Sequence, residues 1–404
     1  MNVLIADKFE PAGIDALRAG GCTVDYQPSL DGDTLRDAIA EGGCAVLVVR
    51  STRVTEAMLA ASGSLNVVVR AGAGYNTIDT EAASRRSILV ANCPGKNAVA
   101  VAELTFALIL GLDRRLVENV VDLRRGAWNK KEYGAARGLK GRTLGLVGFG
   151  QIGQAVARRA AAFGMAVVAW SRSLTPEGAA AAGVSRGASP ADVAERCDIL
   201  SIHLAETDET RRIIIGAVLS KMAPGGYVIN TSRAGVLDYA ALRDAIAERG
   251  LRVGLDVFPD EPTGGTGQFT DGIVRSDGLV YGTHHIGAST DQAQEAIASE
   301  TVRIVLSYMA TGRVENCVNR CARSPARHLI VLRHRNRPGV LAHTLSVIRH
   351  AGINVQEMEN VICEGAHAAV AQIKLDRAAS DDVISAIRTG NEHVLGVSTF
   401  AVTG

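Results

Sequence analysis

Short runs of consecutive aliphatic residues recur along the first 96 positions, and helical stretches separate them. Runs of this kind, without polar alternation, are typical of parallel strands that helices cover on both faces. This pattern predicts four strands, at residues 3–6, 45–49, 66–69 and 88–91.

A second series of aliphatic runs begins at Thr143, again with helical stretches between most of them. It predicts six further strands, at residues 143–147, 166–170, 199–203, 227–231, 253–257 and 279–283. Two alternating series of strands and helices indicate an α/β fold with two doubly wound, Rossmann-like parallel sheets.

Two long helices are predicted next to the second series. The first follows the breaker Pro94-Gly95, begins at Asn97 as its cap and runs to about Arg125, before Gly126. It is mostly apolar and is a candidate subunit interface. The second spans residues 291–311, and its position suggests that the chain returns to the first sheet. The expected domains are therefore 1–96 with 284–315, and 97–283.

The last part of the chain changes its pattern. Residues 316–327 are rich in arginine and contain Ser324-Pro325, which is typical of a linker. Elements in the order strand, helix, strand, strand, helix, strand then follow. This order predicts a ferredoxin-like βαββαβ domain over residues 328–404.

Composition narrows the class of protein. The 404 residues are 47% hydrophobic and 21% charged, which excludes a disordered or collagen-like chain. A net charge of +1 provides no overall field for nucleic acid or an anionic membrane. The seven cysteines are scattered and form no recognisable metal-ligand cluster, so we expect no bound metal. Since neither a signal peptide nor a membrane span is recognisable, we expect a cytoplasmic protein.

A glycine triplet follows the predicted strand 143–147 and opens a helix. Gly148, Gly150 and Gly153 form the pattern G-x-G-x-x-G. Its glycines permit a tight turn, the close approach of a pyrophosphate and close packing of helix on strand, while the helix N-terminus favours an anion. In this βαβ context the triplet predicts a dinucleotide site.

The next strand ends at Ser171 and Arg172, where an NAD site usually has a carboxylate for the ribose 2′-hydroxyl. Arg172 could bind the 2′-phosphate of NADP, or it could stack on the adenine and face water. NAD and NADP both remain possible at this point.

Charged residues follow three later strands. Arg233 comes after one strand, Asp256 and Glu261 after the next, and the pair His284-His285 after the third. Ligands bind at the carboxyl ends of strands in open α/β sheets, and an arginine there can hold a carboxylate with two hydrogen bonds.

The segments GFGQIG, NTSRAG, GLDVFPDEP and HIGAST occur in an order and spacing that resemble the D-isomer-specific 2-hydroxyacid dehydrogenases over residues 1–320. Residues 328–404 resemble the ACT regulatory domain, which is found in the D-3-phosphoglycerate dehydrogenases of this family. The resemblance implies NAD as cofactor, while Ser171 and Arg172 keep NADP open as the alternative.

The resemblance also implies the roles of individual residues. Arg233 would bind the substrate carboxylate, and His285 would be the general acid and base, paired with Glu261, which favours imidazolium. His284 occupies the usual proline position, but His285 directly precedes the Ile-Gly of the motif. The implied cofactor contacts are Gly148, Gly150, Gln151, Ile152, Gly153, Ser171, Arg172, His203, Thr207, Thr231 and Asp256.

Further positions are implied for substrate and effector. The implied substrate contacts are Arg50, Ser51, Ala73, Gly74, Asn97 and Lys130. Lys130 lies in a segment that resembles one that can reach a neighbouring subunit's active site in this family. The resemblance implies a homo-oligomer, which the apolar content of the predicted helix 97–125 also favours. In the ACT-like domain, His334, Asn336 and Asn354 resemble positions that bind L-serine, although the same turns could serve packing alone.

The resemblance implies oxidation of 3-phosphoglycerate to 3-phosphohydroxypyruvate, the entry to serine biosynthesis, with feedback control by L-serine. A neighbouring alternative is an NADPH-dependent reductase of hydroxypyruvate, glyoxylate or another D-2-hydroxyacid. A third possibility is an amino-acid or dinucleotide sensor on a dehydrogenase scaffold, against which the intact Arg233, Glu261 and His285 argue.

Overall fold

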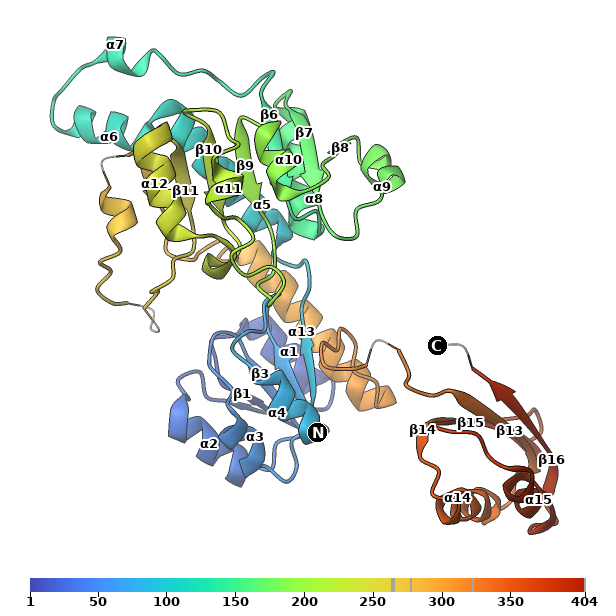
Figure 1. The fold of residues 1–404 in the computed structure, drawn as a ribbon. Helices are drawn as coiled ribbons and strands as arrows, with labels where there is room; N and C mark the ends of the chain where they lie inside the picture. The colour runs from blue at the N-terminus through green and yellow to red at the C-terminus, as the bar shows by residue number, and fades with distance from the viewer. Residues whose placement is uncertain (263–265, 277, 322, 403–404) are drawn as a thin grey trace. The chain divides into compact units, whose positions relative to one another are not determined.

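A computed structural model describes residues 1–262, 266–276, 278–321 and 323–402 (Figure 1). The chain forms two compact units, Met1–Asn319 and Arg320–Gly404. The first unit contains two parallel sheets and the second contains one antiparallel sheet, which confirms the predicted fold class.

The first sheet has five parallel strands in the order β2-β1-β3-β4-β5. They are β1 (Asn2–Ile5), β2 (Thr23–Tyr26), β3 (Val46–Val49), β4 (Val67–Arg70) and β5 (Leu89–Asn92). The connecting helices are α1 (Pro11–Ala19), α2 (Gly32–Glu41), α3 (Glu56–Ala61) and α4 (Thr80–Arg85). Every residue of β3 is buried, because helices cover both faces of this strand.

Helix α13 (Asp291–Thr311) packs against α1 and β4, although the whole second sheet separates them in sequence. Its Ile297 and Ile304 share a core with Val3 and Ile5. Cys317 pairs with Ala91 of β5, so the chain still lies on the first sheet at a position where the sequence suggested a linker.

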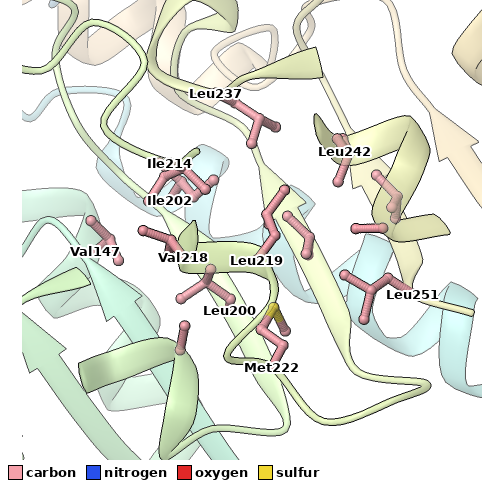
Figure 2. Packing of buried hydrophobic residues seen from close by; sticks show 14 of the residues in the cluster. Val147, Leu200, Ile202, Ile214, Val218, Leu219, Met222, Leu237, Leu242 and Leu251 are labelled. Carbon is pink, nitrogen blue, oxygen red and sulfur yellow. The ribbon is translucent and has the colours of Figure 1, made fainter. Parts of the chain in front are cut away.

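The second sheet has seven parallel strands in the order β12-β11-β10-β9-β6-β7-β8. They are β6 (Thr143–Val147), β7 (Ala166–Trp170), β8 (Ser185–Arg186), β9 (Ile199–Ile202), β10 (Tyr227–Asn230), β11 (Arg252–Leu255) and β12 (Val280–Gly282). Aliphatic side chains from β6, β9 and the covering helices fill the core on one side, including Val147, Leu200, Ile202 and Leu219 (Figure 2).

Helices and short 3₁₀ turns connect these strands. They are α5 (Ala98–Arg114), α6 (Leu116–Arg124), α7 (Lys130–Tyr133), α8 (Gln151–Ala162), α9 (Pro176–Ala181), α10 (Pro190–Glu195), α11 (Gly216–Leu219), η1 (Ala234–Val236), α12 (Tyr239–Arg249) and η2 (Gly272–Arg275). The expected single helix to residue 125 was wrong, because Arg115 adopts a left-handed backbone (φ 50°) that separates α5 from α6.

The second unit has the predicted βαββαβ order. Its elements are β13 (His328–Arg335), α14 (Val340–His350), β14 (Val355–Ile362), β15 (Ala368–Leu375), α15 (Asp381–Thr389) and β16 (Val394–Ala401). The strands form an antiparallel sheet in the order β14-β15-β13-β16, with Leu332, Ile348, Ile373 and Ile387 in the core. Among the helices in the described residues, none has the length and apolarity needed to cross a membrane.

A buried carboxylate anchors α13 to the segments around it. Glu300 is only 7% exposed and accepts hydrogen bonds from Arg303 (2.6 Å) and Asn316 (2.7 Å), while the Lys96 ammonium lies 3.2 Å away. The hydrogen bond from Arg303, helped by those from Lys96 and Asn316, lowers the pKa of Glu300 to about 2 even though burial raises it.

We predict that Glu300→Gln destabilises the protein in a pH-dependent manner. A folded-state pKa below the ordinary value of 4.5 stabilises the fold fully above that pH and less as the pH falls towards 2. The variant should therefore lose about 1–3 kcal/mol near neutral pH, and the loss should shrink below about pH 4.5. Scanning calorimetry over a pH series measures it.

Glu81→Gln is the control, because the Glu81 side chain is 86% exposed in a surface ion pair. A difference between wild type and Glu300→Gln that stays constant from neutral to acid pH would contradict this role of the carboxylate.

Candidate active site

Three neighbouring strands of the second sheet deliver charged side chains to one edge. β10, β11 and β12 are parallel and in register, with Asn230 opposite Leu255 and Leu255 opposite Gly282. Their carboxyl ends therefore lie together, and the segments that follow them carry Arg233, Glu261 and His285. These residues line one pocket of about 580 Å³ together with Glu206, Arg211 and Tyr239.

His285 and Glu261 form a direct pair, with Nδ1 of the imidazole 2.7 Å from Oε2 of the carboxylate. The other carboxylate oxygen accepts the backbone N–H of Phe258 at 2.8 Å. Burial raises the pKa of Glu261, but these two hydrogen bonds and the charges of His285 and Arg233 more than offset it, so the pKa is lowered. A carboxylate that stays ionised orients the ring and stabilises its protonated form. Within the described residues, this carboxylate is hydrogen-bonded to His285 and not to His284.

Asp256 holds the backbone on both sides of His285. This carboxylate is 1% exposed and accepts hydrogen bonds from the N–H of Ile286 (2.9 Å), the N–H of Gly287 (2.9 Å) and the hydroxyl of Thr283 (2.7 Å). His285 has a left-handed backbone (φ 53°), which is unusual for a residue other than glycine. The sequence suggested a contact of Asp256 with the cofactor, whereas its oxygens here position the histidine segment.

Arg233 lies against the first sheet's loops as well as the second sheet. A Cβ atom built on Gly74 would lie 1.9 Å from Nη2 of Arg233, so any other residue at position 74 would displace the guanidinium from this place. Burial lowers the pKa of Arg233, and the negative charges of Glu261 and Glu206 partly oppose this. Among the described residues, the guanidinium makes one hydrogen bond, from Nη1 to the Ser232 carbonyl at 2.6 Å, which leaves the rest of the group for an anion.

Arg70 forms a basic cluster with Arg50 and Arg233. The sequence pointed to Arg50 and Arg233 but not to Arg70. Its Nε is buried without a hydrogen-bond partner, and burial together with the positive charges of Arg233 and Arg50 lowers the pKa of Arg70 to about 10. Arg70 is the last residue of β4, at the carboxyl end of a parallel strand, and that position was the signal available. The positive charges of these three arginines favour the binding of an anion.

The remaining predicted substrate positions differ in their placement. Ser51 lies beside Arg50, and Ala73 accepts a hydrogen bond from the Asn92 amide at 2.6 Å. Asn97 caps α5, and its Oδ1 is buried without a partner. Lys130 is exposed in α7 and is not among the residues that line the pocket of Arg233.

The glycine triplet forms a cradle. Nearby backbone carbonyls leave no room for a side chain at Gly148 or Gly153. A Cβ on Gly148 would lie 2.2 Å from the His203 carbonyl oxygen, and one on Gly153 would lie 2.3 Å from the Gly148 carbonyl oxygen. Gly150 has open space in front of it and caps α8, whose first residues are Gln151 and Ile152. This geometry fits a dinucleotide pyrophosphate at the helix N-terminus.

The predicted cofactor residues His203 and Thr207 follow β9, and Thr231 follows β10. His203 is buried, its Nε2 lies 2.9 Å from the Ser201 hydroxyl, and burial lowers the pKa of His203 to about 3, so the ring is neutral. Its Nδ1 is buried without a partner. The Thr231 hydroxyl lies 3.1 Å from the Thr105 hydroxyl, and the backbone N–H of Thr207 donates to Thr210 at 2.8 Å.

At the end of β7, Arg172 is paired with an acidic residue from another loop. Its guanidinium forms an ion pair with Glu209, although both side chains are largely exposed. The Ser171 hydroxyl lies 3.5 Å from that of Ser173. Glu209 therefore brings a carboxylate next to Arg172, although the end of β7 itself provides none.

The expected effector residues of the second unit do not meet within one chain. His334 is 2% exposed, and its two ring nitrogens contact the Arg335 carbonyl (2.9 Å) and the Asn360 amide oxygen (3.1 Å). Asn336 follows β13, whereas Asn354 precedes β14, which runs parallel to β13 on the far side of β15. The two asparagines therefore lie at opposite ends of the sheet.

Comparison with known proteins agrees with this geometry. Residues 106–287 match the family described as D-isomer specific 2-hydroxyacid dehydrogenase, NAD binding domain. The chain is 37% identical over 318 residues to D-3-phosphoglycerate dehydrogenase of Mycobacterium tuberculosis, covering 78% of this chain and 58% of that protein. It thus spans little more than half the length of that relative.

Two shorter relatives are covered more completely. The chain is 38% identical to hydroxypyruvate reductase of Thermotoga maritima over 65% of this chain and 84% of that protein. The structure of NAD⁺-bound 3-phosphoglycerate dehydrogenase from Entamoeba histolytica superimposes with a TM-score of 0.66 and 25% identity, over 79% of this chain and 99% of that one. The chain belongs to the D-isomer-specific 2-hydroxyacid dehydrogenases and carries their NAD-binding domain.

Proposed function

We propose that this chain oxidises 3-phosphoglycerate to 3-phosphohydroxypyruvate with NAD⁺. The observation that carries the proposal is the cluster of Arg50, Arg70 and Arg233 close to the His285–Glu261 pair. A substrate with a carboxylate at one end and a phosphate at the other matches three guanidinium groups better than a small uncharged or singly charged acid does.

In the proposed reaction Arg233 holds the substrate carboxylate, so that the hydroxyl at C2 faces His285. The imidazole removes the hydroxyl proton, and Glu261 stabilises the imidazolium that forms. When bound, the nicotinamide supplies the acceptor for the hydride that leaves C2. The reverse reaction returns the proton from His285 to the ketone oxygen.

The residues around the glycine cradle would hold the cofactor. The backbone N–H groups at Gln151 and Ile152 would meet the pyrophosphate, with Gly148, Gly150 and Gly153 leaving it room. The Arg172–Glu209 pair supports a preference for NAD over NADP, because a 2′-phosphate would have to displace the Glu209 carboxylate from Arg172.

A second candidate is a reductase of hydroxypyruvate or glyoxylate. Its support is the hydroxypyruvate reductase of Thermotoga maritima and the glyoxylate reductase of Thermococcus litoralis, to which the chain is 38% and 35% identical. The reductase and the phosphoglycerate enzyme differ in whether turnover depends on the substrate phosphate.

The homo-oligomer belongs to the same proposal. Helix α6 buries no residue, and Leu116, Val117, Val120 and Leu123 are each 44–57% exposed along it. An apolar face of this kind would be covered by a second copy of the chain. L-serine would be bound by His334 and Asn336 of one copy with Asn354 of another, since these positions lie at opposite ends of one sheet.

We predict that the purified protein reduces 3-phosphohydroxypyruvate with NADH rapidly and hydroxypyruvate poorly. Arg233→Ala should lower kcat/KM by roughly 10²–10³-fold, because a buried charge contact to the substrate carboxylate is lost, while NADH affinity is kept. Arg233→Lys should restore little, since the two-pronged geometry is missing. Initial rates and NADH fluorescence titrations measure both properties.

The control is Arg196→Ala. Arg196 directly follows α10, a helix connecting strands of the second sheet, and forms an ion pair there with Asp192. Equal loss of turnover and NADH affinity in Arg233→Ala would show that the substrate site is misplaced. Equal rates with the two ketones would instead favour the reductase.

We predict that His285→Asn lowers kcat/KM by about 10²–10⁴-fold and removes the histidine limb from its pH profile. The pKa of Glu261 is lowered, so this carboxylate stays ionised throughout the range of about pH 5–8 in which histidines titrate. Glu261 therefore contributes no limb in that range. His284→Asn is the matched control and should keep both rate and limb; the opposite pattern would exchange their roles.

We predict that Glu209→Gln shifts coenzyme preference towards NADPH. Arg172 would then be available to a 2′-phosphate, and the ratio of NADPH to NADH dissociation constants should fall about two- to fivefold, as expected for an exposed ion pair. Fluorescence titration measures the ratio. Glu195→Gln is the control on the same domain, and an unchanged ratio in Glu209→Gln would exclude competition for Arg172.

A further inference from the structure

Asp7 binds the loop that carries the basic cluster. Its Oδ2 accepts three consecutive backbone N–H groups, from Arg50 (2.6 Å), Ser51 (3.1 Å) and Thr52 (3.0 Å). Its other oxygen lies 3.2 Å from the Ser51 hydroxyl, which can donate to it. One side chain thus makes four hydrogen bonds to three residues of the same loop.

The topology of the first sheet brings these groups together. Strands β1 and β3 are adjacent and parallel, with Ile5 opposite Val48, so the residues that follow them leave the sheet at the same edge. Asp7 comes two residues after β1, and Arg50 directly follows β3. Separated by more than 40 positions in sequence, they meet because the strand order places β3 next to β1.

The loop has the form of an anion site that the protein fills itself. Successive N–H groups that converge on one point form a concave site for phosphate or carboxylate oxygens in many proteins. Here the carboxylate of Asp7 occupies that point. A substrate phosphate therefore cannot use these three N–H groups and must be met by side chains, for which Arg50 of this loop and Arg70, whose pKa both Arg50 and Asp7 affect, are the candidates.

The charge of Asp7 also acts on the basic cluster. Burial, Arg233 and Arg50 lower the pKa of Arg70, whereas the negative charge of Asp7 acts in the opposite direction. Asp7 thus compensates part of the repulsion between the arginines without hydrogen bonding to their guanidinium groups.

We propose that Asp7 is a positioning residue of the substrate site, which fixes the Arg50-Ser51-Thr52 loop so that Arg50 meets the substrate phosphate. This inference rests on the proposed function, because it assigns the phosphate end of the substrate to the loop. Asp7 itself touches neither substrate nor cofactor.

The test compares two ketones, 3-phosphohydroxypyruvate and hydroxypyruvate, in the wild type, Asp7→Asn and Asp7→Ala. We expect the KM for the phosphorylated ketone to rise about tenfold in Asp7→Ala, since hydrogen bonds to a charged group are lost. Asp7→Asn keeps an oxygen acceptor in the same place and should lie between the wild type and Asp7→Ala. The kcat values, the KM for hydroxypyruvate and the Kd for NADH should remain within about twofold, which is smaller than the effect of one ordinary hydrogen bond.

Asp15→Ala is the matched control, because Asp15 is an exposed acid on α1, a helix that covers the first sheet. Melting temperatures verify that the variants fold, and Asp7→Asn keeps the test valid if Asp7→Ala does not. Equal losses for both ketones would assign Asp7 a general structural role and overturn the proposal. A lower KM for the phosphorylated ketone would also overturn it, because the freed N–H groups would then bind phosphate themselves.

The wild type separates this inference from the function on which it rests. If the wild type does not prefer the phosphorylated ketone, the proposed function fails and the role of Asp7 fails with it. If the wild type prefers that ketone and the Asp7 variants keep the same preference, only the role of Asp7 is overturned.

Discussion

The repulsion among three partly buried guanidinium groups is the constraint around which the rest of the candidate site is arranged. Arg50 and Arg70 come from the ends of β3 and β4, and Arg233 follows β10 of the other sheet. Buried like charges are costly unless opposite charges approach them. Asp7, Glu206 and Glu261 supply part of that compensation from the protein, and an anionic substrate would supply the rest.

Carboxylates that face the backbone provide the rigidity that this arrangement needs. Asp7 fixes the loop after β3, and Asp256 fixes the segment on either side of His285. Both carboxylates follow strands, and both accept N–H groups from the end of a neighbouring strand. Backbone donors are strong and directional, so such contacts hold a loop in place at low cost in side-chain freedom.

The sequence predicted the fold well, because aliphatic runs and glycine turns are local signals. It also named Arg233, Glu261 and His285, whose motifs are contiguous. It could not find Arg70, which looks like an ordinary strand end, or Asp7, whose partners are far away along the chain. The break at Arg115 was missed because neither glycine nor proline occupies the left-handed position there. The opposite placement of Asn336 and Asn354 follows from strand order, which the residue pattern alone does not reveal.

His285 has a left-handed backbone, which is a strained conformation for a residue with a Cβ. The strain costs about 1–2 kcal/mol of conformational free energy, whereas glycine would adopt this conformation without strain. The backbone N–H groups of Ile286 and Gly287 donate to the Asp256 carboxylate and hold the histidine segment there nonetheless. If His285 transfers the proton as proposed, the residue best for stability and the residue best for proton transfer differ at this position, and selection for thermal robustness alone would favour glycine.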